Sequence, residues 1–134
     1  MREQEHNLQV ALFNWARFYE EKYPQLGLLF SIPNGGHRHI TVAKKMKAEG
    51  VKAGVPDICL PVPTMRPKDE FGELFMIPGL FIEMKYGSNK PTKNQKRWLK
   101  ALSEKGYKTA VCYSDQEAKE LIVNYLGLPL DLLK

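Results

Sequence analysis

The stretch GLFIEMK, residues 79–85, has the apolar composition of a buried β-strand but contains Glu83 and Lys85. A second stretch of the same kind, GVPDICL at residues 54–60, contains Asp57. Burying an unpaired carboxylate or ammonium costs several kcal/mol even after the surroundings relax. The three charges therefore need compensating partners, and a divalent metal ion with a phosphodiester substrate could supply them.

Alternation along the strands places the charges on one face. Successive side chains of a strand point to opposite sides, so Phe81, Glu83 and Lys85 share a face, with Glu83 and Lys85 about 7 Å apart. The two stretches are most simply antiparallel, because a loop joins them. Asp57 can then lie beside Glu83, although the length of the loop leaves the register open.

Two neighbouring carboxylates repel each other unless one is protonated or a cation lies between them. Oxygen ligands favour the hard ions Mg²⁺ and Mn²⁺. Lys85 would orient or polarise an attacking water and neutralise charge that develops on a phosphate. This set predicts phosphodiester hydrolysis. The alternative is a buried Lys–Glu pair that only stabilises the sheet.

Glu5 is a further acidic candidate. The N-terminal helix has an apolar stripe at Leu8, Leu12 and Trp15, and the same face extended toward the N-terminus reaches Glu5. Glu5 could hold a water beside the metal. An acidic residue in the first turn of a helix also interacts favourably with the helix dipole, and this is the competing explanation.

The predicted elements give the order α-β-α-β-β-α-β-α. The helices are expected at 3–22, at 39–49, from the N-cap Thr92 to Gly106, and from Ser114 to Gly127; the strands are expected at 26–33, 56–62, 79–86 and 107–114. A right-handed crossover makes the last two strands parallel. The insert at 63–78 is an extended hairpin loop or a loop with one extra short strand. The fold class is therefore α/β, a mixed sheet flanked by helices, in one domain over residues 1–134.

Composition restricts the class of protein. With 134 residues, 43% hydrophobic and 26% charged, the chain resembles an ordinary soluble protein. It has no apolar run of the roughly 20 residues that span a bilayer and no signal-peptide core at its start. We expect a cytoplasmic protein that does not associate with membranes, with Cys59 and Cys112 as buried free thiols.

The net charge is +5, and its distribution is uneven. Residues 85–108 hold eight Lys or Arg against Glu104, and residues 37–52 hold five against Glu49. Two basic blocks on one small domain suggest a polyanion as partner, although Lys-rich helix faces are often simply solvated.

Further motifs surround the three charges: Glu5-x-x-x-Gln9 followed by Trp15, Ile32-Pro33-Asn34-Gly35-Gly36 with Arg38, KAEGVKAGVPD at 47–57, Glu83-Met84-Lys85, and Gln95-x-x-Trp98. In this order and spacing they resemble the PD-(D/E)xK nuclease superfamily and, within it, the VRR-NUC (virus-type replication–repair nuclease) family. The resemblance covers residues 3 to 126. It implies a restriction-endonuclease-like fold in a stand-alone member of the family.

The resemblance also implies roles for single residues. Asp57 and Glu83 would bind the catalytic Mg²⁺ or Mn²⁺ directly, with the backbone carbonyl of Met84 as a further ligand. Lys85 would be the catalytic lysine. Glu5 would complete the acidic cluster through water.

Gln95 matches a family glutamine near the active site, although with Thr92 it also forms a good capping box. Asn34, Gly35 and Gly36 would shape a loop beside the site, and Arg38 would contact phosphate. The expected DNA-binding set consists of Asn34, Gly35 and Arg38 with Lys90, Lys93, Lys96 and Arg97.

The resulting hypothesis is a metal-dependent, structure-selective DNA endonuclease that cleaves branched DNA such as Holliday junctions and acts as a homodimer. A nuclease for flaps or other DNA structures is the alternative within the same chemistry. A catalytically silent DNA-binding module of the same fold is an alternative of another class. An unrelated α/β protein with a buried ion pair is the third.

Overall fold

The computed structural model describes residues 2–33 and 39–134. The helices are α1 (Arg2–Tyr19), α2 (Ile40–Ala48), α3 (Lys93–Glu104) and α4 (Asp115–Leu126), with two 3-10 helices, η1 (Pro24–Leu28) and η2 (Leu130–Leu133). The strands are β1 (Phe30–Ser31), β2 (Ile58–Leu60), β3 (Thr64–Pro67), β4 (Leu74–Ile77), β5 (Leu80–Met84) and β6 (Lys108–Cys112). With β3 and β4 set aside as an excursion, the order of the main elements is the predicted one.

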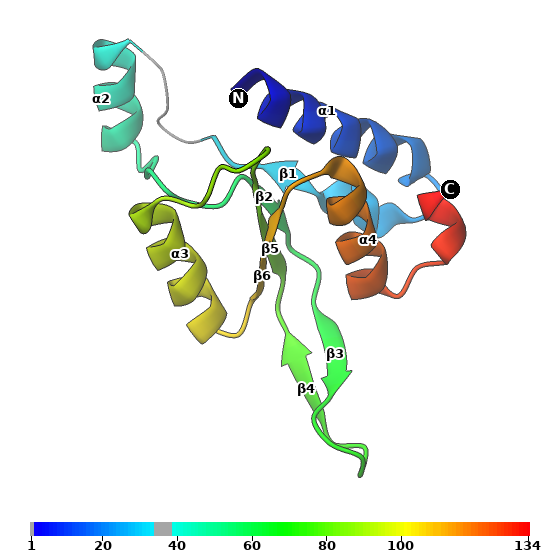
Figure 1. The fold of residues 1–134 in the computed structure, drawn as a ribbon. Helices are drawn as coiled ribbons and strands as arrows, with labels where there is room; N and C mark the ends of the chain where they lie inside the picture. Colours follow the sequence, from blue (N-terminus) through cyan, green and yellow to red (C-terminus); the bar gives the residue numbers. More distant parts are fainter. Residues whose placement is uncertain (1, 34–38) are drawn as a thin grey trace.

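A four-stranded mixed sheet lies at the centre, in the order β1-β2-β5-β6 (Figure 1). Strands β2 and β5 are antiparallel, with Ile58 opposite Ile82 and Leu60 opposite Leu80. Strands β5 and β6 are parallel and are joined through α3. Both pairings confirm the sequence-based prediction, because a loop joins the first pair and a crossover helix joins the second.

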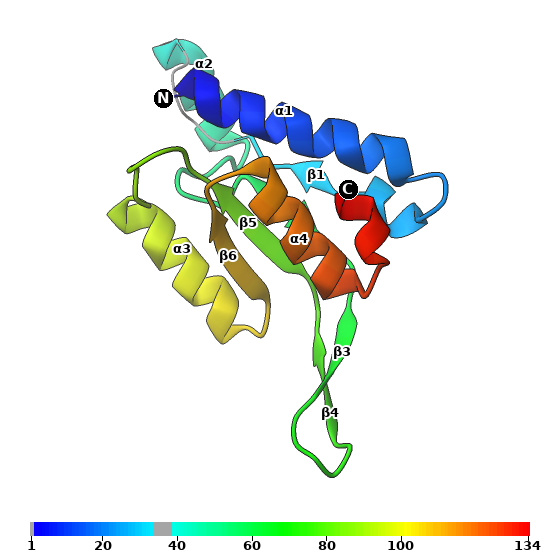
Figure 2. The same cartoon turned by 45° about the vertical axis from the view of Figure 1, so that its right-hand side comes forward.

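The helices cover the two faces of the sheet unequally. Helices α1 and α4 lie on one face and α3 on the other (Figures 1 and 2). The core lies on the α1–α4 side, where Leu80, Ile82 and Met84 of β5 pack with Leu12 of α1 and Ile122 of α4. Alternation along β5 therefore turns Phe81, Glu83 and Lys85 toward the α3 side.

The segment after α1 differs from the prediction. Residues 26–29 were expected in a strand over 26–33, but η1 occupies Pro24–Leu28 and β1 is only two residues long. Helix α1 ends at Tyr19 rather than at residue 22. Pro24 at the start of η1 favours a helical turn there, since its fixed φ suits the first position of a helix. Leu26 and Leu29 are therefore buried by a helical turn instead of a strand. A short apolar run is compatible with either structure, so the sequence alone does not distinguish them.

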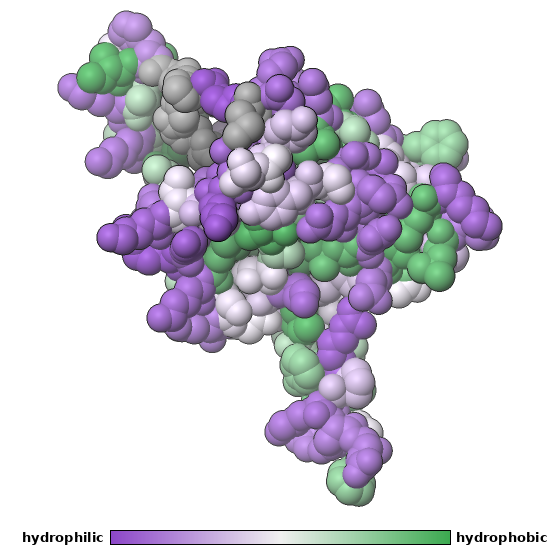
Figure 3. Space-filling model, in the orientation of Figure 1, coloured by the Kyte–Doolittle hydropathy of each residue, from purple (hydrophilic) through white to green (hydrophobic). Residues whose placement is uncertain are grey.

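Strands β3 and β4 form a separate two-stranded sheet, which we call the β3–β4 arm (residues 64–77). The arm projects away from the body of the molecule in both ribbon views and stands clear of it in the space-filling view (Figure 3). It is the hairpin form of the predicted insert, with both of its strands ordered into a ladder.

Cys59 and Cys112 are free and buried, as predicted. Burial, with a smaller contribution from the nearby charge of Glu117, raises the pKa of the Cys112 thiol to about 12. In the described part of the chain, no helix has the length and apolar character needed to cross a membrane.

Candidate active site

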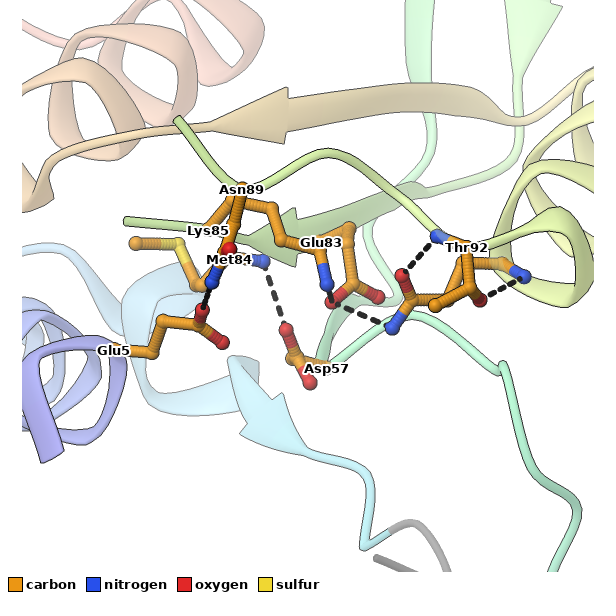
Figure 4. Close-up of polar contacts among 8 residues, drawn as sticks. Glu5, Asp57, Glu83, Met84, Lys85, Asn89 and Thr92 are labelled. Atoms are coloured by element: carbon orange, nitrogen blue, oxygen red, sulfur yellow. Dashed lines mark hydrogen bonds and ion pairs between the residues drawn. The ribbon is translucent and has the colours of Figure 1, made fainter. Parts of the chain in front are cut away.

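Asp57, Glu83 and Lys85 meet on the α3 side of the sheet (Figure 4). Asp57 directly precedes β2, Glu83 lies in β5, and Lys85 directly follows β5. The Oδ2 atom of Asp57 accepts a 2.8 Å hydrogen bond from the backbone N–H of Met84. This contact fixes the start of β2 against the end of β5 and resolves the register that the sequence left open.

Glu83 is a buried carboxyl with an unusual environment. Its side chain is 2% exposed, and Oε1 has no hydrogen-bond partner among the described residues. Oε2 accepts a 3.4 Å hydrogen bond from Nε2 of Gln95 and lies 3.9 Å from Nζ of Lys85. Burial, then the proximity and the charge of Asp57, raises the pKa of Glu83 to about 9, against the opposing effect of Lys85. At neutral pH the Glu83 carboxyl is therefore protonated when no cation is present.

The backbone of β5 also points into the site. Within a strand, the N–H and C=O of one residue face the same neighbouring strand. The Met84 N–H donates to Asp57, so the Met84 carbonyl is directed to the same side. The next N–H, that of Lys85, turns to β6 and donates to the Cys112 carbonyl at 2.9 Å, which anchors the lysine.

Glu5 reaches the same region from the first turn of α1, but it is held apart from the other two acids. Its Oε2 accepts a 3.1 Å hydrogen bond from Nδ2 of Asn89 (Figure 4). Across residues 2–33 and 39–134, no three His, Cys, Asp or Glu side chains gather closely enough to hold a metal ion. The charge of Glu5 nevertheless contributes to the raised pKa of Glu83. A role for Glu5 through water stays a prediction.

Gln95 takes part in the capping box that the sequence suggested and also contacts Glu83, while a role in catalysis stays a prediction. It forms a capping box with Thr92, whose N–H donates to Oε1 of Gln95 at 2.8 Å and whose hydroxyl accepts from the Gln95 N–H at 3.1 Å. The amide nitrogen left over donates to Glu83. The capping box thus fixes the rotamer from which Gln95 reaches the buried carboxyl.

Sequence reasoning missed two further amides, Asn89 and Asn94. Nδ2 of Asn94 donates a 2.8 Å hydrogen bond to the carbonyl of Ala53, in the loop that leads to Asp57. Gly54 in this loop has φ +90, and a Cβ there would lie 2.8 Å from the same nitrogen. The signal was present in the polar run SNKPTKNQ between strand and helix, where three amide side chains fall within seven residues.

We expect Asn94→Ala to slow DNA cleavage about tenfold at saturating DNA, because the loop that positions Asp57 loses its anchor on α3. The free energy of unfolding should fall by only about 1 kcal/mol, the usual value of one hydrogen bond. Single-turnover cleavage and a thermal melt measure the two effects. Asn124→Ala, on the exposed side of α4, is the matched control, and an equal slowing by both variants would contradict the positioning role.

The expected DNA-binding residues are partly placed. Lys90, Lys93, Lys96 and Arg97 are all exposed, in the segment before α3 and in its first turns. Helix α2 adds three exposed lysines, Lys44, Lys45 and Lys47. Figure 3 shows hydrophilic surface over both helices. Asn34, Gly35, Gly36 and Arg38 lie outside the described residues.

The donor set fits a hard divalent cation. Asp57, Glu83 and the Met84 carbonyl offer only oxygen atoms, the ligands that Mg²⁺ and Mn²⁺ prefer. A bound cation would give the unpartnered Oε1 of Glu83 a partner and would displace the proton that Glu83 holds in its absence. A buried carboxyl oxygen without a partner is costly, so its presence favours a site for an ion over a purely structural ion pair.

A mixed sheet that carries two acids and a lysine on one face, beside two basic helices, is the arrangement expected of a nuclease domain. The sequence matches the VRR-NUC domain family over residues 1–116. Among solved structures, a VRR_NUC domain protein is similar at 26% identity and a TM-score of 0.69, over 92% of this chain and 88% of that one. None of the curated proteins matches. The chain belongs to the VRR-NUC family and is a nuclease domain, as the sequence motifs indicated.

Proposed function

We propose that the protein is a Mg²⁺- or Mn²⁺-dependent, structure-selective endonuclease that hydrolyses phosphodiester bonds in branched DNA, such as Holliday junctions, and acts as a homodimer. The observation that carries the proposal is the set Asp57, Glu83 and Lys85, in which Glu83 and Lys85 are buried and one oxygen of Glu83 lacks a partner. Such a set destabilises the metal-free fold. It suits phosphoryl transfer, because that reaction is accelerated by charges held in place to stabilise the transition state.

The cation would be held by Asp57, Glu83 and the Met84 carbonyl, with Glu5 contributing through water. When bound, the ion supplies neutralisation of the scissile phosphate and acidifies the attacking water. Asp57 keeps its place by accepting from the Met84 N–H, and Glu83 keeps its place through Gln95. The protein thus provides ligands whose orientation is set before DNA arrives.

Lys85 would act directly on the substrate. Its side chain is mostly buried, so its ammonium is screened less by solvent than a surface lysine would be. The ammonium donates hydrogen bonds and has no acceptor capacity, which suits it to orient the attacking water and to bind a phosphate oxygen as negative charge develops.

Basic residues on two separate helices support a branched substrate. Lys44, Lys45 and Lys47 lie on α2, and Lys93, Lys96 and Arg97 lie on α3. Phosphate contacts position a nucleic acid without reading its sequence. A DNA in which two duplex arms diverge from a branch point would place phosphates along both helices, whereas one straight duplex has a single axis to follow.

The test compares a four-way junction, a flap, a linear duplex and a single strand, each incubated with Mn²⁺ and with EDTA. Wild type is expected to cut the junction in symmetry-related strands, only with metal, and Asp57→Asn should not cut. Cutting of the flap alone would leave the chemistry intact and overturn the junction assignment. Junction binding without any cleavage would favour the silent DNA-binding module.

A further inference from the structure

The two faces of the β3–β4 arm differ in composition. In an antiparallel pair, residues directly opposite each other lie on the same face. Met65 pairs with Met76 and Pro67 pairs with Leu74, so one face consists of these four side chains, all apolar and all exposed. We call this set the outward face. The turn at the end of the arm adds Phe71, which is 86% exposed.

The opposite face of the arm is the one that meets the body. It carries Arg66, whose guanidinium donates to the carbonyls of Asn124 and Tyr125 at the end of α4, at 3.2 and 2.9 Å. Phe75 pairs with Arg66 across the ladder and lies on this face. Arg66 therefore fastens the arm to its own chain from this face, whereas the side chains of the outward face are exposed.

The exposed apolar area is large for one small domain, and patches of this size are often functional. The outward face and Phe71 together present on the order of 500 Å², near the upper end of what monomers expose in one patch. A two-stranded hairpin is also marginal in water unless a further layer covers it. Two such faces stacked on each other would bury about 1,000 Å² in total, which is the lower bound for a specific interface.

The charge of the arm argues against DNA as its partner. The turn at residues 68–73 carries Asp69, Glu70 and Glu73 against Lys68, in a chain whose net charge is +5. Lys68 is already paired with Glu73 at 3.4 Å. An acidic turn repels phosphate, and it is attracted to the basic remainder of another copy of the same chain.

We propose that the outward face of the β3–β4 arm is the contact surface between two copies of this chain. The contact is isologous, so Met65, Leu74 and Met76 of one copy pack on the same residues of the other. Only the purpose of the dimer rests on the proposed function, since paired cuts in a junction require two active sites. The contact itself needs neither metal nor DNA.

The experiment measures the mass of the full chain by light scattering at about 20 μM, without DNA or metal, a concentration at which micromolar association is populated. Wild type is expected to be a dimer. Met76→Glu places two like charges near the symmetry axis and should weaken association at least 100-fold. Phe75→Glu, on the opposite face of the same strand, is the matched control and should leave the dimer intact. A monomeric wild type, or equal dissociation by both variants, would overturn the interface.

A milder pair of variants guards against loss of folding. The native Cys59 and Cys112 are buried, so an engineered surface thiol is the one that a short bismaleimide crosslinker reaches first. Met76→Cys should crosslink into a covalent dimer, and Phe75→Cys should not. The reverse result would place the contact on the other face of the arm and overturn the proposal.

The test of dimerisation is independent of nuclease activity. Lys85→Met should keep the dimeric mass, because Lys85 is remote from the arm in the fold. A wild-type protein that is dimeric but cleaves no DNA would count against the proposed function alone. A monomeric protein that still cleaves DNA would count against the arm interface and leave the chemistry standing.

Discussion

Replacing Lys85 with Met is expected to slow DNA cleavage about 1,000-fold at saturating metal, the usual effect of removing one preorganised donor from a transition state. The chain length of the side chain is kept and only the ammonium is lost. DNA binding in EDTA should change little, since Lys85 is one mostly buried charge beside many exposed basic residues. Single-turnover cleavage and a binding titration separate the two quantities.

Lys105→Met provides the control for this variant. Lys105 is an exposed lysine at the C-cap of α3, far along the helix from Gln95. Its replacement removes the same charge from the protein and should leave the cleavage rate within twofold. Cleavage by Lys85→Met within tenfold of wild type would exclude the lysine from the chemistry.

Glu83→Gln should have opposite effects on the apo protein and on metal binding. Because the pKa of Glu83 is raised to about 9 in the folded state from an ordinary value of 4.5, the apo fold favours the protonated carboxyl. Glutamine copies the shape of that neutral carboxyl and has an amide that can donate to Asp57. We expect the variant to be more stable than wild type in EDTA at pH 8, and to bind Mn²⁺ at least 100-fold more weakly.

The difference in stability between wild type and Glu83→Gln should depend on pH. The stability contributed by protonated Glu83 is complete below pH 4.5 and is lost as the pH rises toward 9, because the unfolded chain releases the proton first. In this window the free energy of unfolding of wild type should fall by up to about 1.4 kcal/mol per pH unit relative to the variant. Urea unfolding in EDTA from pH 5 to 9 measures the difference. Parallel curves for the two proteins would mean that Glu83 is ionised in the apo fold.

The charged face of the sheet was predictable because two strong rules coincide there. Strand alternation is strict, and an unpaired charge in a buried strand is too costly to be accidental. Together the two rules predicted that Glu83 and Lys85 share one face of the sheet and that Asp57 lies near Glu83. The register itself depended on the hydrogen bond between Asp57 and the Met84 N–H, a tertiary contact for which the sequence has no local signal.

The parts that sequence reasoning missed are those in which local preference is weak. The run LGLLFSIP is apolar enough for a strand, and only packing of Leu26 and Leu29 under α1 decides in favour of a turn. Asn89 and Asn94 are ordinary loop residues by composition. Their importance appears only when the chain brings Glu5 and the loop before Asp57 within reach of them.

The position of the β3–β4 arm in the chain has a consequence for how such proteins can diverge. The arm is the connection of a hairpin whose strands are β2 and β5, and the pair Leu60–Leu80 closes that hairpin before the arm begins. A connection can lengthen or shorten at little entropic cost, about 0.6 kcal/mol for each doubling. The arm can therefore vary in length and character while Asp57 and Glu83 keep their register, so that assembly and chemistry are free to evolve as separate modules of one small domain.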